Sequence, residues 1–187
     1  MSIMGLHRKK GEDREENDFY ATDSKAIPPL LNFLGWQHGG KVIRENSCGA
    51  GHLCWPLEVA GHTVIASDLI DRGYGMTGVD FLESHWLDDM RYDGVIMNPP
   101  YKFARQFIEK SLKLAPVVCA FLRITFLEAD VRREFFKQFP PKYVCVFIDR
   151  MASAKNADFV TYNGSAVCYA WFIWERGYQG APSIIWI

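Results

Sequence analysis

Short apolar runs alternate with segments of helical periodicity along most of this chain. Each run is rich in β-branched or aromatic residues and is bounded by glycine, proline or charge, which is typical of buried strands. The runs cover residues 41–44, 63–66, 75–79, 94–97, 117–122, 143–148 and 168–174. Strands that alternate with helices indicate βαβ units. We therefore expect an α/β fold with a mostly parallel, seven-stranded sheet and helices on both faces.

Helix signals lie between these runs. The segments with such signals are residues 24–35, 53–60, 103–114 and 128–139. The first two lead into Gly35 and Gly61, and the last two stop short of prolines, which cannot continue a helix. Beyond residue 148 no helix separates the remaining strands, which predicts an antiparallel strand or hairpin at one edge of the sheet.

Composition favours a single globular domain with a substantial core. The chain has 187 residues, of which 49% are hydrophobic and 14% aromatic. No apolar stretch approaches the ~20 residues of a membrane span. Residues 1–17 are polar and mixed in charge, so we expect a flexible tail there and one domain over residues 18–187. This tail lacks the apolar core of a signal peptide, which favours a cytoplasmic location.

Cysteine usage points to the same compartment. The five cysteines are Cys48, Cys54, Cys119, Cys145 and Cys168. An odd number without a Cys-x-x-Cys pair argues against a disulfide framework and against a zinc site, so no metal is expected. Four of them lie among apolar or small residues, which predicts buried free thiols in a reducing cytosol.

The most specific chemical signal is Asn98-Pro99-Pro100-Tyr101, directly after the apolar run 94–97. Proline lacks an N–H and restricts φ, so the carbonyl groups of Asn98 and Pro99 can point into a site. The Asn98 side chain adds another acceptor, and such acceptors suit the two hydrogens of a planar amino group. Tyr101 offers a flat face on which the amine-bearing group can stack. On its own, Pro-Pro is equally consistent with a simple strand-to-loop stop.

Three further positions indicate a nucleoside-like ligand. Gly49 and Gly51 follow the first strand and allow a sharp turn with a close approach to a ligand. Asp68 ends the second strand, where a carboxylate can bind both hydroxyls of a ribose. Asp80 and Phe81 follow the third strand and could bind the amino edge and the face of an adenine. Each aspartate alone is also consistent with a helix cap or a turn.

The first loop also restricts the charge of this ligand. The chain lacks the glycine-rich phosphate-binding motifs. Glu45 in that loop would repel a pyrophosphate and suits a positively charged group. A ligand with a ribose, an adenine and a positive charge but no phosphate is S-adenosylmethionine, which we therefore predict as the cofactor.

Taken in order, these residues resemble the S-adenosylmethionine-dependent amino-methyltransferases, whose signature is Asn, Asp or Ser followed by Pro-Pro and an aromatic residue. The glycine loop precedes Asn-Pro-Pro-Tyr, as in the adenine-specific class. Residues 18–23 are similar to the N-terminal cofactor motif of that class, with Asp23 in place of the usual proline. Residues 122–128 and 169–177 resemble a subgroup of small methyltransferases common in bacteriophages and prophages. The resemblance covers residues 18–187.

This resemblance implies a class I, Rossmann-like methyltransferase fold and methylation of the adenine amino group in DNA. The implied catalytic residues are Asn98, Pro99, Pro100 and Tyr101. The implied cofactor-binding residues are Tyr20, Thr22, Glu45, Ser47, Gly49, Gly51, Asp68, Leu69, Asp80, Phe81 and Asn98. The base, flipped out of the duplex, would contact Tyr101 and one or more of Phe103, Phe159 and Tyr162. Core packing is an equally good interpretation of Phe103, because it begins an amphipathic segment.

The substrate has alternatives. The net charge of −1 gives no global support for a nucleic-acid partner, and we expect no separate target-recognition region. The same chemistry on RNA or on a protein glutamine is therefore a second hypothesis, and a non-catalytic binding module is a third. The polar loop 149–166 is the expected substrate contact, whereas Trp171 and Trp174 are expected to pack in the core.

Overall fold

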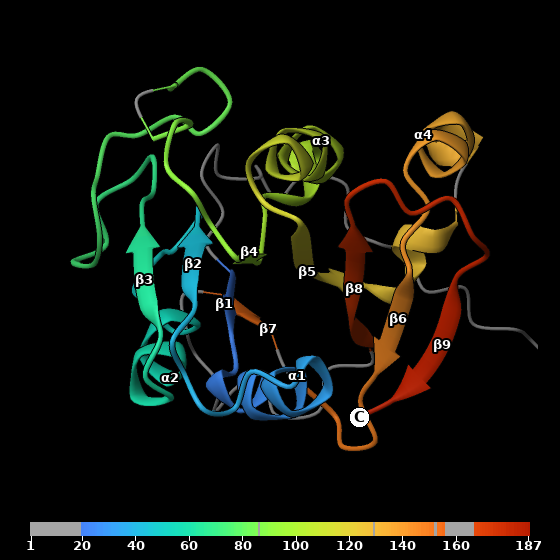
Figure 1. Cartoon of the computed structure of the whole chain (residues 1–187), viewed down its shortest axis with the longest axis horizontal. Coiled ribbons are helices and arrows are strands. Elements are labelled where there is room, and N and C mark those ends of the chain that lie inside the picture. The colour runs from blue at the N-terminus through green and yellow to red at the C-terminus, as the bar shows by residue number, and fades with distance from the viewer. Residues whose placement is uncertain (1–19, 86, 129, 152, 156–166) are drawn as a thin grey trace, which may run out of the picture.

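The computed structural model describes residues 20–85, 87–128, 130–151, 153–155 and 167–187. Its main feature is a seven-stranded sheet with the strand order β3-β2-β4-β5-β8-β6-β9 (Figure 1). The strands are β2 (Val42–Glu45), β3 (Thr63–Ala66), β4 (Gly94–Met97), β5 (Val117–Arg123), β6 (Tyr143–Val146), β8 (Tyr169–Glu175) and β9 (Ser183–Trp186). A separate two-stranded sheet pairs β1 (Tyr20–Thr22) with β7 (Ser153–Lys155).

A helix occurs in each of the four segments that carry helix signals. The helices are α1 (Ile27–Leu34), α2 (Cys54–Val59), α3 (Ala104–Leu114) and α4 (Arg133–Gln138). Short 3-10 helices cover Ser24–Ala26, Tyr101–Phe103, Ile124–Leu127 and Asp130–Arg132. The Asp23 carboxylate caps the first of these by accepting the N–H of Lys25, and Gly35, at φ 68°, ends α1.

The predicted α/β fold class is confirmed, with one change in the sheet. Strands β3, β2, β4 and β5 are parallel, and β9 is parallel to β6. Strand β8 runs antiparallel to both of its neighbours, so the antiparallel strand lies inside the sheet and not at its edge. Residues 169–174 of β8 are buried, and an interior position also pairs both hydrogen-bonding edges of such an apolar strand.

One predicted strand was wrong, and three observed strands, β1, β7 and β9, were not predicted. In the stretch 75–79, the only pairing among the described residues is an isolated bridge between Ser67 and Met76. Gly75 and Gly78 adopt positive φ values of 70° and 71°, which interrupt an extended conformation. The edge strand β9 was not predicted, and it brings the sheet to seven strands.

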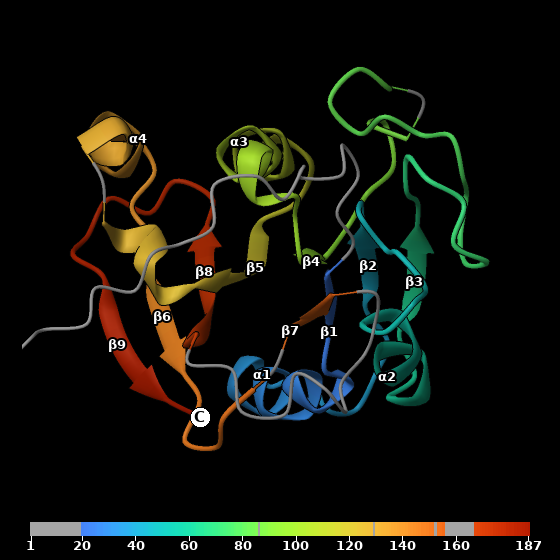
Figure 2. The same ribbon diagram turned by 180° about the vertical axis from the view of Figure 1, so that it is seen from behind.

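The helices form a layer on each face of the sheet. Figures 1 and 2 show α1 and α2 on one face and α3 and α4 on the other. Each layer buries its own core: Leu30 of α1 and Leu57 of α2 belong to one cluster, and Ile108 of α3 and Phe135 of α4 belong to the other. The sheet between them is therefore covered by apolar side chains on both sides.

Strand β8 shows how the sheet serves both cores. Phe172 and Trp174 pack in the cluster under α3 and α4, whereas Trp171 and Ile173 pack in the cluster under α1 and α2. Both indole N–H groups are satisfied, because Trp171 donates to the carbonyl of Ala26 (2.9 Å) and Trp174 donates to that of Phe139 (3.0 Å). The prediction that these tryptophans are core residues is confirmed.

The burial of the cysteines and the length and polarity of the helices can be compared with the sequence predictions. Cys48, Cys54, Cys119 and Cys145 are buried, as predicted, and Cys168 is exposed. Within the described ranges, no helix has the length and apolar character needed to cross a membrane.

Candidate active site

A cleft of about 1240 Å³ lies where the loops that follow β3, β2, β4 and β5 come together. In an open α/β sheet, ligands bind outside the carboxyl ends of the strands. Most of the predicted site residues line this cleft: Tyr20, Ser47, Asp68, Leu69, Asp80, Phe81, Asn98, Pro99, Pro100, Tyr101 and Phe103. Its volume exceeds what one small ligand needs, so it has room for two reactants.

The orientation of Asn98 is determined by one hydrogen bond. Its side-chain Nδ2 donates to the backbone carbonyl of Tyr20 at 2.9 Å. A carbonyl oxygen can only accept, so the amide nitrogen must face Tyr20 and the amide oxygen Oδ1 must face the other way. Because Asn98 lines the cleft, Oδ1 is the acceptor that remains for a ligand.

The backbone around Asn98 is held in place as well. The carbonyl of Asn98 accepts a hydrogen bond from Ser47 Oγ at 3.1 Å. The carbonyl of Pro100 accepts the N–H of Phe103 at 2.8 Å, which closes the turn before α3. The Pro99 carbonyl lies between these two anchored groups, so the prolines present acceptors in a defined direction.

Glu45, at the end of β2, does not line the cleft but contacts Ser47, which does. It is buried, and Oε1 accepts the N–H of Ser47 (3.0 Å) and is 3.2 Å from Ser47 Oγ. Burial raises the pKa of Glu45 to about 8, although the two hydrogen bonds from Ser47 oppose that shift. Ser47 therefore connects this carboxyl group to the backbone of Asn98.

Asp68 organises the glycine loop. Its Oδ2 accepts the N–H of Gly49 at 2.8 Å, and its Oδ1 accepts the N–H of Ile70 at 2.9 Å. Gly49 and Gly51 have φ values of 52° and 83°, which favour glycine. A Cβ on Gly51 would lie 2.7 Å from the ring of Tyr74, so the close approach at Gly51 is to that ring, and neither glycine lines the cleft.

Three buried polar atoms at or near the cleft lack a partner among the described residues: Asn46 Oδ1, the Thr22 hydroxyl oxygen and Arg123 Nε. Asn46 lines the cleft and donates from Nδ2 to Ser111 Oγ (3.2 Å), whereas its Oδ1 accepts nothing. Thr22 does not line the cleft, and its hydroxyl, on a side chain that is 2% exposed, has no partner. Buried polar groups are rarely left unpaired, so these atoms indicate a polar ligand close by.

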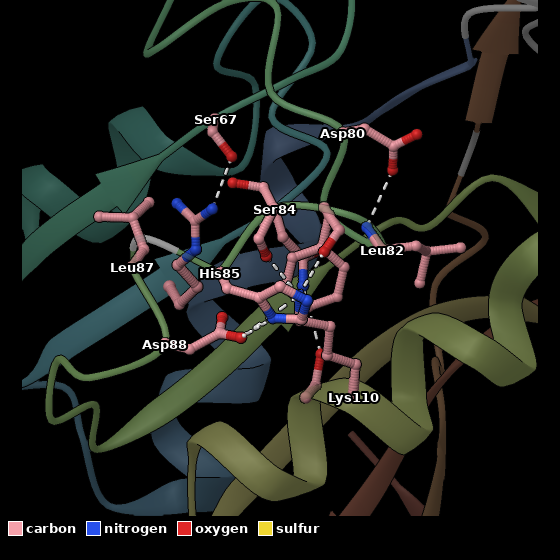
Figure 3. Close-up of polar contacts among 12 residues, drawn as sticks. Ser67, Asp80, Leu82, Ser84, His85, Leu87, Asp88 and Lys110 are labelled. Atoms are coloured by element: carbon pink, nitrogen blue, oxygen red, sulfur yellow. Dashed lines mark hydrogen bonds and ion pairs between the residues drawn. The ribbon is translucent and has the colours of Figure 1, made fainter.

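A lysine from α3 fixes the loop that carries Asp80 and Phe81. Lys110 Nζ donates to the carbonyl groups of Phe81 (2.8 Å) and Ser84, and it lies 3.4 Å from Asp88 Oδ2 (Figure 3). The same carboxylate is 2.8 Å from His85 Nδ1. We call this group, Lys110 with Phe81, Ser84, His85 and Asp88, the lysine clamp.

Within that loop, Asp80 and Phe81 differ in exposure. Asp80 is exposed at the cleft wall, and its Oδ1 accepts the N–H of Leu82 at 2.9 Å. Phe81 is 4% exposed and its ring packs against Phe107 at 5.0 Å between centroids. Lys110 Nζ lies 5.0 Å from the centre of the Phe81 ring. Phe81 is therefore a rigid apolar wall of the cleft.

Tyr101 is more enclosed than the sequence suggested. Its ring lies 5.8 Å from that of Tyr20, and the guanidinium of Arg123 sits over it at 5.0 Å. The phenol oxygen is 3.5 Å from Ser153 Oγ and from the hydroxyl of Tyr169. Burial raises the pKa of Tyr101 above its ordinary value, so the phenol stays neutral.

Of the remaining predicted substrate contacts, one lies at the cleft and two lie outside the described residues. Phe103 lines the cleft and is 38% exposed, so it is not a core residue. Phe159 and Tyr162 lie outside the described residues, as does most of the loop 149–166. Its described end forms β7, which pairs Ser153 with Thr22 of β1.

Sequence reasoning missed several residues that shape the cleft or its walls, among them Asn46, Lys110, Arg123 and Arg132. Asn46 directly follows β2 and Arg123 is the last residue of β5, and that position was a usable signal. Lys110 and Arg132 lie in amphipathic segments where a cation is ordinarily a solvated residue, so nothing local distinguished them. Among the described residues, no group of three His, Cys, Asp or Glu side chains could hold a metal ion.

Comparison with known proteins identifies the fold. No protein-family model matches the chain, and no curated protein matches it. A candidate RNA methyltransferase from Pyrococcus horikoshii is 19% identical over 82% of this chain and 81% of its own, with a TM-score of 0.58. Magnesium protoporphyrin IX methyltransferase from Synechocystis PCC 6803, solved with S-adenosylmethionine, is 15% identical over 82% of this chain and 79% of its own, with a TM-score of 0.53.

A third similar structure is larger. The methyltransferase subunit of a type I restriction-modification system from Streptococcus thermophilus is 12% identical and has a TM-score of 0.65. The match covers 92% of this chain and 48% of that subunit, so the chain spans about half of its length. The chain thus has the Rossmann-like fold of these methyltransferases, and at identities of 19% or lower the likeness concerns the fold alone.

Proposed function

We propose that this chain transfers a methyl group from S-adenosylmethionine to an exocyclic amino group, and we assign that group to adenine in DNA. The observation that carries this proposal is the anchoring of Asn98 Nδ2 to Tyr20, which leaves Oδ1 as the free acceptor of a residue that lines the cleft together with Pro99. Two neighbouring acceptors match the two hydrogens of a planar amine.

The residues of the cleft fit the cofactor. Asp68, Asp80 and Glu83 line the part formed by the loops after β2 and β3, where Arg72 is the one cation among the described lining residues, and the buried Glu45 contacts Ser47 of the same lining. This acidic surrounding suits a sulfonium and an ammonium group. The unpaired Oδ1 of Asn46, which lines the cleft, is an acceptor for the amino-acid part of the ligand.

S-adenosylmethionine supplies an electrophilic methyl group on a positively charged sulfur. Asn98 Oδ1 and the Pro99 carbonyl hold the amino hydrogens of the target, which localises the nitrogen lone pair toward the methyl group. The same oxygens stabilise the positive charge that develops on the nitrogen. The methylated nitrogen then loses its proton to solvent, so the site needs no strong base.

Much of the expected rate comes from positioning. The bonds from Asn98 to Tyr20 and from Ser47 to Asn98 preset the acceptors before any ligand arrives. Holding two reactants in line can supply effective molarities of ~10⁵ M or more. In duplex DNA, adenine would have to leave the base stack to reach the acceptors.

The choice of DNA is supported by motif order and by one of the similar structures, a type I restriction-modification methyltransferase subunit. RNA is the second candidate, favoured by the similarity to the candidate RNA methyltransferase. Both substrates present the same amino group to Asn98, so the polymer has to be identified by experiment.

The test is nucleoside mass spectrometry on DNA and RNA from cells that express the chain or its Asn98→Ala variant. We expect extra N-methyladenine in DNA with the unaltered chain. The variant should lose about 100-fold or more in transfer rate, since removal of one preorganised polar group costs this much in other enzymes. Asn32→Ala, at an exposed position of α1, is the matched control and should keep full activity.

The outcomes separate the candidates. Methyladenine in RNA alone would replace DNA as the substrate while keeping the mechanism. If neither nucleic acid changed, methylated glutamine in protein would be measured next. Full activity of Asn98→Ala would refute the mechanism itself.

A further inference from the structure

Three cations at the cleft are stacked on aromatic rings. They come from three separate elements: the turn before α3, the end of β5 and the 3-10 helix before α4. The pairs are Lys102 with Phe103 (5.1 Å to the ring centre), Arg123 with Tyr101 (5.0 Å) and Arg132 with Phe126 (4.6 Å). All six residues line the cleft. We call this group the cation–aromatic surface.

None of these three cations has a carboxylate within 4.0 Å in the part of the chain that the structure describes. Several basic residues elsewhere are paired, among them Arg105 with Glu109 (3.5 Å), Lys137 with Glu134 (2.8 Å) and Lys142 with Glu175 (2.8 Å). The loops after β4 and β5 thus contribute positive charge that no carboxylate of the described residues neutralises.

The two arginines are held without losing their charge. Arg132 donates from Nε to the Phe126 carbonyl (2.7 Å) and from Nη2 to the carbonyl groups of Thr125 (3.2 Å) and Glu128. Carbonyl groups orient a guanidinium but do not neutralise it. The Arg123 guanidinium makes side-chain hydrogen bonds with Tyr169 and Tyr101, which leave its charge in place, and its buried Nε has no partner among the described residues. A planar cation that no described carboxylate neutralises is suited to a phosphate.

We propose that the cation–aromatic surface binds one unpaired strand of nucleic acid. Phosphates lie on Arg123, Arg132 and Lys102, and bases stack on Tyr101, Phe103 and Phe126. Aromatic platforms with unpaired cations are the usual means of holding single-stranded nucleic acid. This inference rests on the proposed function, because it places the strand that carries the target base in the same cleft.

Arg123 has a particular role in this arrangement. Its guanidinium covers the Tyr101 ring, on which the target base is expected to stack. A base that stacks there displaces the guanidinium, which then reaches the adjoining phosphate. A protein glutamine brings neither a ring nor a phosphate, so the surface favours nucleic acid over protein.

The test is binding, so that it does not depend on catalysis. A fluorescent single-stranded oligonucleotide of about 12 nucleotides is titrated with the protein, with S-adenosylhomocysteine present, at several salt concentrations. We expect affinity to fall steeply with salt. Each of Lys102→Gln, Arg123→Gln and Arg132→Gln should weaken binding about threefold to tenfold and reduce the slope of log K against log salt by about 0.7.

Two controls keep the test sharp. Arg105→Gln, which lies close to Lys102 in sequence but is paired with Glu109, and Lys137→Gln on α4 should leave affinity and slope unchanged. Arg132 also ties the 124–128 turn together, so its variant is compared by thermal melting. Lys102 is exposed, and its replacement tests the surface without risk to folding.

Each outcome bears on the inference separately from the proposed function. Binding that the three variants do not alter, or equal binding of the paired duplex, would overturn it even if DNA is methylated. Binding that the variants weaken supports it even if no methyl transfer is found, in which case only the proposed function fails.

Discussion

The two halves of the cleft are built from different interactions. The half formed by the loops after β2 and β3 is acidic, and hydrogen bonds hold it at Glu45, Asp68 and the lysine clamp. The half formed by the loops after β4 and β5 contributes only cations as charged residues, and at Arg123 it depends on stacking against Tyr101. Residues of opposite charge thus line one cleft together with Asn98.

The difference teaches how one cleft can receive two ligands. Hydrogen bonds have strict geometry, so the acidic half is preorganised for a ligand of constant shape. Cation–aromatic stacking is weaker and tolerates movement, with energies of ~0.5–2 kcal/mol. The basic half can therefore accept a strand whose bases differ from site to site.

The largest effect within the acidic half is expected for Asp68→Ala. This change removes the acceptors of Gly49 and Ile70 and the group assigned to the ribose. Cofactor affinity should fall about 100-fold or more, because the carboxylate that would accept hydrogen bonds from both ribose hydroxyls is lost. Each hydrogen bond to a charged group contributes ~1.5–3 kcal/mol. Calorimetric titration measures the affinity. Asp71→Ala, which removes an exposed turn carboxylate, should change little, and normal affinity of Asp68→Ala would remove the ribose role.

A smaller effect is expected from the ionisation of Glu45. Its pKa of about 8 means that it is mostly neutral at pH 7, and only the ionised form attracts a cation. Cofactor affinity should rise roughly tenfold between about pH 6 and pH 9, with release of a proton on binding. Titration in buffers of different ionisation enthalpy detects that proton. Glu45→Gln should remove the difference, whereas Glu134→Gln should retain it.

The same group affects stability. The folded pKa of Glu45 exceeds its ordinary value of 4.5, so the folded state binds a proton that the unfolded state has already lost. The free energy of unfolding should therefore decline as pH rises from about 4.5 to about 8. Denaturant melts across this range should show a flatter profile for Glu45→Gln. An unchanged profile would mean that Glu45 is ionised when folded.

The smallest effect concerns the lysine clamp. Lys110→Met leaves the Phe81 and Ser84 carbonyl groups without their donor and loosens the loop that carries Asp80. We expect KM for the cofactor to rise about fivefold with kcat nearly unchanged, as for a loss of uniform binding. Lys113→Met, an exposed position on the same helix, is the control. A fall in kcat alone would instead place Lys110 in the chemical step.

Local patterns predicted most of the fold. The four helices and six of the seven predicted strands follow from periodicity, caps and breakers, which act within a few residues. The strand prediction for residues 75–79 was wrong because the glycines were interpreted as strand boundaries. Gly75 and Gly78 instead adopt positive φ values. Strand β9 was missed because it is a short edge strand, in which Ile184 and Trp186 are exposed. Its sequence therefore shows little alternation of apolar and polar residues.

The candidate site was predictable where its residues directly follow strands. Asn98, Asp68 and Ser47 come after β4, β3 and β2, and parallel strands bring such positions to one edge. Lys110 and Arg132 were not predictable, because their partners are the backbone carbonyl groups of loops. A contact with a backbone carbonyl leaves no recognisable pattern of side chains in the sequence.

The sequence by itself determined the kinds of element and the acidic character around the glycine loop, and its Asn98-Pro99-Pro100-Tyr101 motif predicts the proposed reaction. Tertiary structure alone decided the interior place of β8, the contact of Tyr20 with Asn98 and the gathering of Arg123, Arg132 and Lys102 at one end of the cleft. The physical reason is the distance along the chain over which each kind of interaction acts. Backbone propensity and periodicity act between neighbours in the chain, whereas the charge of a cleft depends on which distant loops the sheet order brings together.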